Sequence, residues 1–173
     1  MEPAPSHGRD ETPFERADRN LGELLGELRV ALPGVQVLFA FLLIVPFNDR
    51  FDDVTALQRD LYLGTLICTA FASALLIAPS MYHRLEFHLG DKEHLVKVSN
   101  RLTIAGLTLM AFAMIGVTAM LTDFVFGTVA AVTTTAAVGL AFALFWYLLP
   151  LQRRRTLSRR RSETGGSETQ RAP

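Results

Sequence analysis

Four long apolar runs without charge constrain this chain more than any other feature of its sequence. Residues 30–47, 61–79, 102–121 and 124–149 contain no Asp, Glu, Lys, Arg or His. A helix rises about 1.5 Å per residue, so each run can cross the roughly 30 Å hydrocarbon core of a bilayer. The rest of the chain is too short to wrap four such runs as a soluble core. We therefore expect an all-α fold, a four-helix transmembrane bundle.

The basic residues are unevenly placed along a chain whose net charge is zero. Of the 17 Lys and Arg residues, only Arg50 and Arg59 lie between the first and second runs, and none lies between the third and fourth. The others precede the first run, lie in 80–101 or follow the fourth run. The positive-inside rule therefore predicts a multi-pass protein of the cell membrane, with both termini and 80–101 in the cytoplasm.

Composition divides the chain into three parts. Residues 1–11 are polar, contain prolines and show no periodicity, so this segment is expected to be disordered. The membrane domain is expected to cover 12–150, and 151–173 is expected to be a basic, disordered cytoplasmic tail. The tail begins with Arg153, Arg154 and Arg155. These arginines are expected either to bind anionic lipid or only to fix the topology.

A helix is predicted to begin before the first apolar run. Thr12 and Glu15, with a proline between them, form a capping-box pattern. The leucines that follow recur on one face, which predicts an amphipathic cytoplasmic helix ending in a bend at Pro33. This helix is expected either to lie on the inner leaflet or bind a partner, or to pack on the protein's own spans. Packing on its own spans is favoured, because its polar face is acidic as well as basic.

The connections between the runs carry further local signals. Thr55 and Gln58 form a second capping box, which predicts a helix start near Ala56. The acidic segment 48–53 is consistent with a calcium site, but a solvated turn is favoured, since the EF-hand spacing is absent. A tight turn is expected at 122–123. The third helix is expected to start in 80–101, because one apolar seam runs unbroken from this polar segment into the third span, which should project a turn or two into the cytoplasm. That seam consists of Leu95, Val98, Leu102, Ala105, Leu109, Phe112 and Gly116.

Several short segments of the chain resemble a family of small four-span membrane proteins of actinobacteria. They are Glu27-Leu28-Arg29, the stretch 34–43, Pro46-Phe47, Arg50-Phe51, Ala78-Pro79 and His83-Arg84. The resemblance covers roughly 15–153 and implies the four-span fold and the membrane. The family is a domain of unknown function, and some relatives carry the label of sodium/proton antiporter. The resemblance therefore implies no established activity.

Small residues at a spacing of four predict close helix packing in the membrane. In the fourth run they are Gly127, Ala131, Thr135, Gly139 and Ala143. The second run has similar stripes, which include Gly64, Cys68 and Ala72. These faces are expected to pack within the chain, in a homo-oligomer or on a membrane protein partner. Gln36, the costliest polar residue to bury in the runs, is expected to be an intramembrane hydrogen-bonding clamp.

Three histidines in the central polar segment are the best candidates for chemistry. His83, His88 and His94 are five and six residues apart, so they do not share one helix face as metal ligands would. No nucleophile, phosphate-loop or paired-cysteine motif is present. We therefore expect no enzyme, no catalytic residue, no cofactor and no metal.

The function expected from these features is that of a non-enzymatic structural or accessory membrane component. A small transporter or channel is the alternative, although the uncharged runs hold no ionisable residue of the kind that proton-coupled transport normally requires. Partners are expected to be the bilayer and other membrane proteins, not nucleic acid. If a site exists, it is expected on the cytoplasmic rim around Arg29, His83 and Arg84.

Overall fold

The computed structural model describes residues 12–86, 92–149 and Gln152. All of its elements are helical, and they fall into two compact units that meet between Gly116 and Val117. Four helices are long and apolar enough to cross a membrane: Glu15–Phe47, Ala56–Leu85, His94–Phe126 and Thr128–Leu148. The expected all-α fold with four span-like helices is confirmed.

Helix α1 (Pro13–Ile44) begins at the predicted capping box. The Glu15 N–H donates to Thr12 Oγ1 (3.3 Å), and the Thr12 N–H donates to the Glu15 carboxylate (2.9 Å). The expected bend at Pro33 does not end the helix, because Pro33 lies inside one continuous element of 32 residues. Proline removes only one N–H bond, and neighbouring helices can hold the rest of the helix in place. The amphipathic segment and the first span are therefore one helix.

Two short 3-10 turns, η1 (Val45–Phe47) and η2 (Asp49–Asp53), join α1 to α2 (Ala56–Glu86). Asn48 Oδ1 accepts the backbone N–H of Arg50 (3.1 Å), and the acidic side chains of η2 are exposed. The second capping box is also present. The Gln58 N–H donates to Thr55 Oγ1 (3.3 Å), and the Thr55 N–H donates to Gln58 Oε1 (3.0 Å).

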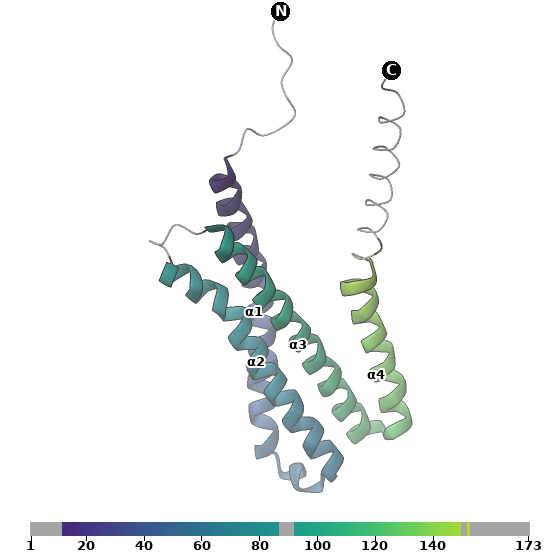
Figure 1. Ribbon diagram of the computed structural model, residues 1–173. Coiled ribbons are helices and arrows are strands. Elements are labelled where there is room, and N and C mark those ends of the chain that lie inside the picture. Colours follow the sequence, from purple (N-terminus) through teal and green to yellow (C-terminus); the bar gives the residue numbers. More distant parts are fainter. Residues whose placement is uncertain (1–11, 87–91, 150–151, 153–173) are drawn as a thin grey trace, which may run out of the picture. The chain divides into compact units, whose positions relative to one another are not determined.

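The first unit consists of α1, α2 and the part of α3 (Lys92–Phe126) up to Gly116. The Tyr62 hydroxyl of α2 donates to the carbonyl oxygen of Leu42 of α1 (2.9 Å), which ties the start of α2 to the end of α1. Between α2 and α3, Gly106 lies against Leu76, and Gly116 lies against Thr65. Helix α2 is therefore antiparallel to α1 and α3, which run in the same direction (Figure 1).

The core of this unit lies at the centre of the three helices. Its buried members are Leu24, Leu28, Val35, Ala72 and Leu76, with residues of α3 such as Leu107 and Met110 packed around them. Because Leu24 and Leu28 belong to the amphipathic segment, that segment packs on the protein's own helices. The structure thus supports the favoured alternative over a helix lying free on a leaflet.

The buried face of α3 follows the predicted seam only in part. Leu95 and Gly116 of that seam are buried, but Ala105 and Phe112 are exposed. Ser99, Thr103 and Ala113, which lie outside the seam, are also buried. Gly106 shows why: a Cβ there would lie 2.8 Å from Leu76 Cγ. Small side chains allow close approach of helices, so α3 meets α2 at Gly106, while Phe112 lies on an exposed face.

The second unit begins at Val117 and contains the end of α3, α4 (Thr128–Phe142) and the π-helical segment η3 (Ala143–Leu148). The chain reverses at Gly127 and not at 122–123, because Gly127 has φ of 84°, a conformation that strongly favours glycine. Gly127 is thus a turn residue and not a packing position. Along the rest of the stripe, Ala131 is buried, Thr135 and Gly139 are half-buried, and Ala143 is exposed.

Candidate functional site: a polar groove between α1 and α3

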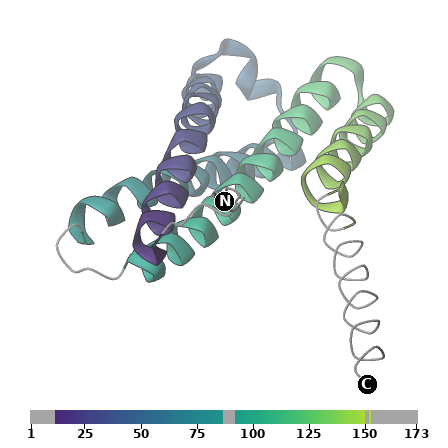
Figure 2. The ribbon, with the colours of Figure 1, turned by 90° about the horizontal axis from the view of Figure 1, so that it is seen from above.

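A groove with a volume of about 330 Å³ lies between the first turns of α1 and the first turns of α3. Figures 1 and 2 show these two helix starts side by side, whereas the last turns of α2 lie apart from both. Helix α1 contributes Asn20, Glu23, Leu24 and Glu27, and α3 contributes Val96, Lys97 and Asn100. The volume is at the lower end of the range for ligand sites, which is about 300 to 1,000 Å³.

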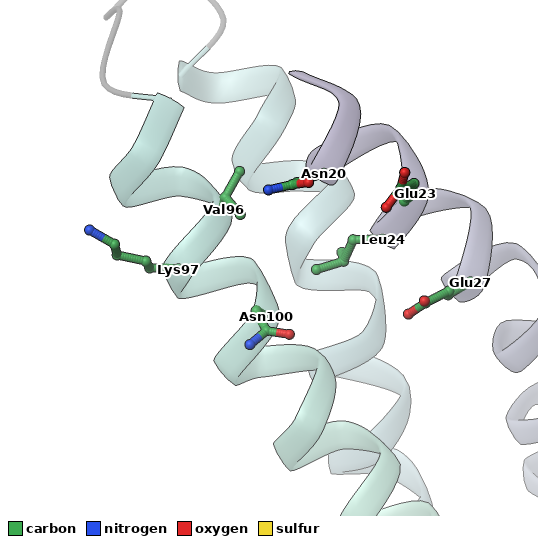
Figure 3. Close-up of a pocket in the computed structure, with 7 residues that line it drawn as sticks. All are labelled: Asn20, Glu23, Leu24, Glu27, Val96, Lys97 and Asn100. Carbon is green, nitrogen blue, oxygen red and sulfur yellow. The ribbon is translucent and has the colours of Figure 1, made fainter. Parts of the chain in front are cut away.

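Helical periodicity explains how these side chains meet. Asn20, Leu24 and Glu27 are four and three residues apart, so they share one face of α1. Val96 and Asn100 are four residues apart on α3. In Figure 3 the Leu24 and Glu27 side chains extend from α1 toward α3, and the Lys97 amine is directed away from α1. The groove therefore has an apolar base of Leu24 and Val96, with carboxylate and amide groups at its sides.

The charges around the groove favour a cationic group. Arg19 Nη1 donates to Glu23 Oε1 at 3.0 Å, but both side chains are largely exposed, so this pair is weak. Within the described part of the chain, no ion pair holds the Glu27 carboxylate. With Lys97 turned away, the oxygens of Glu23, Glu27 and Asn100 are the groups that a bound amine or guanidinium would meet.

Arg29 precedes the first apolar run in the sequence, but it lies beside the apolar part of the neighbouring helices. The hydrogen bond of Tyr62 to Leu42 sets the register of the antiparallel α1 and α2, and Leu28 and Leu76 belong to one core cluster in agreement with it. In this register Arg29 is level with Leu75 of α2. Leu75 in turn lies against Gly106 of α3. Gly106 is five residues past Arg101, which is the last charged residue before the uncharged run of α3. Arg29 is thus about 7 Å inside that run along the helix axis. It is exposed, so its long side chain can extend back toward the helix end.

The three rim residues predicted from sequence do not form one site. His83 is half-buried and Arg84 is exposed on the last turns of α2. By the same register, His83 is level with Leu21 of α1, eight residues or about 12 Å along the axis from Arg29. The groove residues were not predicted, because their signal depends on the pairing of α1 with α3, which no local pattern reveals.

The remaining predicted site residues are placed as follows. Gln36 is exposed on α1, and within the described part of the chain its side chain makes no interhelical hydrogen bond. His83 and His94 are described, but His88 lies outside the described residues. Among the residues that the structure describes, no three His, Cys, Asp or Glu side chains gather as a metal site would require. The disordered segments predicted at 1–11 and 151–173, with Arg153, Arg154 and Arg155, lie outside the described residues except for Gln152.

The fold and its groove define a class of protein, an all-helical chain with four helices long and apolar enough to cross a membrane. Comparison of the sequence with known families gives a more particular result. The chain belongs to a family of unknown function (DUF6328), which matches residues 10–150. No curated protein and no solved structure matches the chain. The match covers all four span-like helices, in agreement with the expected uncharacterised family, and assigns no activity.

Proposed function

We propose that this protein is a non-enzymatic accessory component of the cell membrane that binds a partner protein through the groove between α1 and α3. The observation that carries the proposal is the groove itself, in which Glu23, Glu27 and Asn100 surround an apolar base. This chemistry fits a Lys or Arg side chain on an apolar segment of a membrane protein. Carboxylates bind such groups with charge-assisted hydrogen bonds.

The proposed orientation places both termini and the groove in the cytoplasm. Its support is the distribution of charge, since Arg50 and Arg59 are the only basic residues between the first and second apolar runs, and none lies between the third and fourth. The groove lies at the opposite end of these helices, where α1 and α3 begin. In this orientation the partner's basic group would meet Glu27 close to the inner surface of the bilayer.

A photo-crosslinking amino acid at Asn100 tests the groove in native membranes. We expect one adduct of defined mass from Asn100, and none from the same probe at Asn48, an exposed asparagine at the other end of the helices. Glu27→Lys should abolish the Asn100 adduct because it places two positive charges together. An adduct that persists at full yield in Glu27→Lys would contradict the proposed basic partner.

A small transporter or channel remains the second candidate, and the depth of Arg29 is the observation that favours it. Ionisable residues at membrane depth often mark ion or substrate pathways when they face a bundle interior, and the exposed Arg29 would do so in an oligomer that covers it. Proton or sodium flux into liposomes that contain the purified protein, lost in Arg29→Gln, would favour this candidate over the accessory role. The accessory role predicts no such flux.

A further inference from the structure

Two buried hydroxyl groups on α3 lack the hydrogen bonds that such groups normally make. Ser99 is 0% exposed and Thr103 is 5% exposed. Neither Ser99 Oγ nor Thr103 Oγ1 has a hydrogen-bond partner among the described residues. A buried polar group left in this state costs about 1 to 3 kcal/mol, so each needs an explanation.

Other hydroxyl groups in these helices donate hydrogen bonds to carbonyl oxygens of their own helix. On α2, Thr65 donates to the Leu61 carbonyl (2.7 Å), and Thr69 donates to the Thr65 carbonyl (2.8 Å). On α3, Thr108 donates to the Ile104 carbonyl (2.7 Å). Ser99 and Thr103 could each reach the carbonyl four residues earlier, yet both are oriented differently. Their hydroxyls are therefore available to a group between the helices.

Ser99 and Thr103 lie on the face of α3 that is turned toward α2. Ser99, Thr103 and Gly106 are four and three residues apart, so they share a face of α3. A Cβ on Gly106 would lie 2.8 Å from Leu76 Cγ and 3.2 Å from Leu75 Cβ. Because the two helices are antiparallel, the turn before Gly106 lies opposite the turn after Leu75. Thr103 is thus opposite Pro79, whose side chain is fully buried.

Pro79 creates an unpaired acceptor at this point. Proline has no N–H, so the carbonyl of Leu75, four residues earlier, lacks its helical donor. The Thr103 hydroxyl therefore lies opposite the position of α2 where the helical hydrogen-bond ladder is interrupted, whereas Ser99 lies one helical turn farther along α3. The Thr103 hydroxyl and the Leu75 carbonyl are neutral, so they suit a neutral ligand better than an ion, which would be buried without a compensating charge.

We propose that Thr103 and the Leu75 carbonyl bind one internal water molecule. A buried water needs two to four polar partners, and this site offers two. The water donates to the Leu75 carbonyl in place of the missing N–H and bonds the Thr103 hydroxyl. It joins α2 to α3 beside Pro79, level with the start of the uncharged run of α3.

Thermal unfolding of the purified full-length protein tests the water site. Thr103→Val keeps the shape of the side chain and removes the hydroxyl, so we expect the Tm to fall by about 2 to 6 °C. Thr103→Ser keeps the hydroxyl and should stay closer to the wild-type Tm. Thr69→Val is the matched control, because Thr69 is equally buried and its hydroxyl bonds a carbonyl of its own helix. Its Tm should change less than that of Thr103→Val.

The proposal is overturned if Thr103→Val raises the Tm, since removal of a dry, unpaired hydroxyl is stabilising. Pro79→Ala gives a second test, because it restores an N–H donor for the Leu75 carbonyl. In that background Thr103→Val should lower the Tm by less than it does in the wild type. Equal losses in the two backgrounds would exclude the Leu75 carbonyl as a partner of the water.

Discussion

At the scale of single residues, small side chains decide which helix faces meet. Gly116 of α3 lies directly against the Thr65 hydroxyl, and Gly106 lies against Leu76. Gly64 of α2 belongs to a similar small-residue stripe, yet a Cβ there would meet nothing within 4 Å. Spacing alone therefore does not identify a packing residue, because small residues at the same spacing also lie on exposed faces of α2.

Substitution of Gly116 and Gly64 distinguishes a glycine at a helix contact from a glycine on an exposed face. Gly116→Val forces branched atoms against Thr65, and we expect it to lower the free energy of unfolding by about 1 to 3 kcal/mol. Gly64→Val introduces the same side chain on an exposed face of α2 and should have little effect. Thermal unfolding in detergent measures both variants. Equal stability of the two would show that α2 and α3 do not approach closely at Gly116.

At the scale of elements, α1 combines a span and an amphipathic segment in one helix. The buried residues Leu24, Leu28 and Val35 continue along one face through Pro33. The segment before the uncharged run is thereby part of the three-helix unit. It also brings Glu23 and Glu27 to the groove, so this continuity of α1 positions the candidate site.

The contribution of this segment can be measured at Leu28, which is 2% exposed in the core. Leu28→Ala should lower the free energy of unfolding by about 2 to 5 kcal/mol, because it leaves a cavity. Val30→Ala is the control, since Val30 is 81% exposed on the same helix. Chemical or thermal unfolding measures the stability of both variants. A mild effect at Leu28, similar to that at Val30, would mean that the segment does not pack on α2.

Local sequence patterns predicted where helices begin. They did not predict which helix faces are in contact. Both capping boxes formed, at Thr12 and Thr55, because their hydrogen bonds join residues three positions apart. The predicted seam of α3 matches its buried face only in part, since Leu95 and Gly116 are buried but Ala105 and Phe112 are exposed. Which face is buried depends on close approach to α2 at Gly106, which no local pattern reveals. The turn at Gly127 was missed because uncharged sequence continues through it.

At the scale of the whole molecule, the protein is a member of a family of unknown function, and it has four span-like helices. Helices α1 to α3 have 32, 31 and 35 residues, more than the roughly 20 needed to cross a bilayer. The surplus lengths of α1 and α3 at the end where both begin form the groove. The proposed function depends on that end facing the cytoplasm.

Cysteine labelling tests this orientation most directly. Cys68 is the only cysteine, so Cys68→Ser provides a background without thiols. In that background, a membrane-impermeant maleimide should label Asn48→Cys in intact cells. It should label Asn100→Cys only after the membrane is permeabilised. Labelling of Asn100→Cys in intact cells, with protection of Asn48→Cys, would contradict the cytoplasmic placement of the groove.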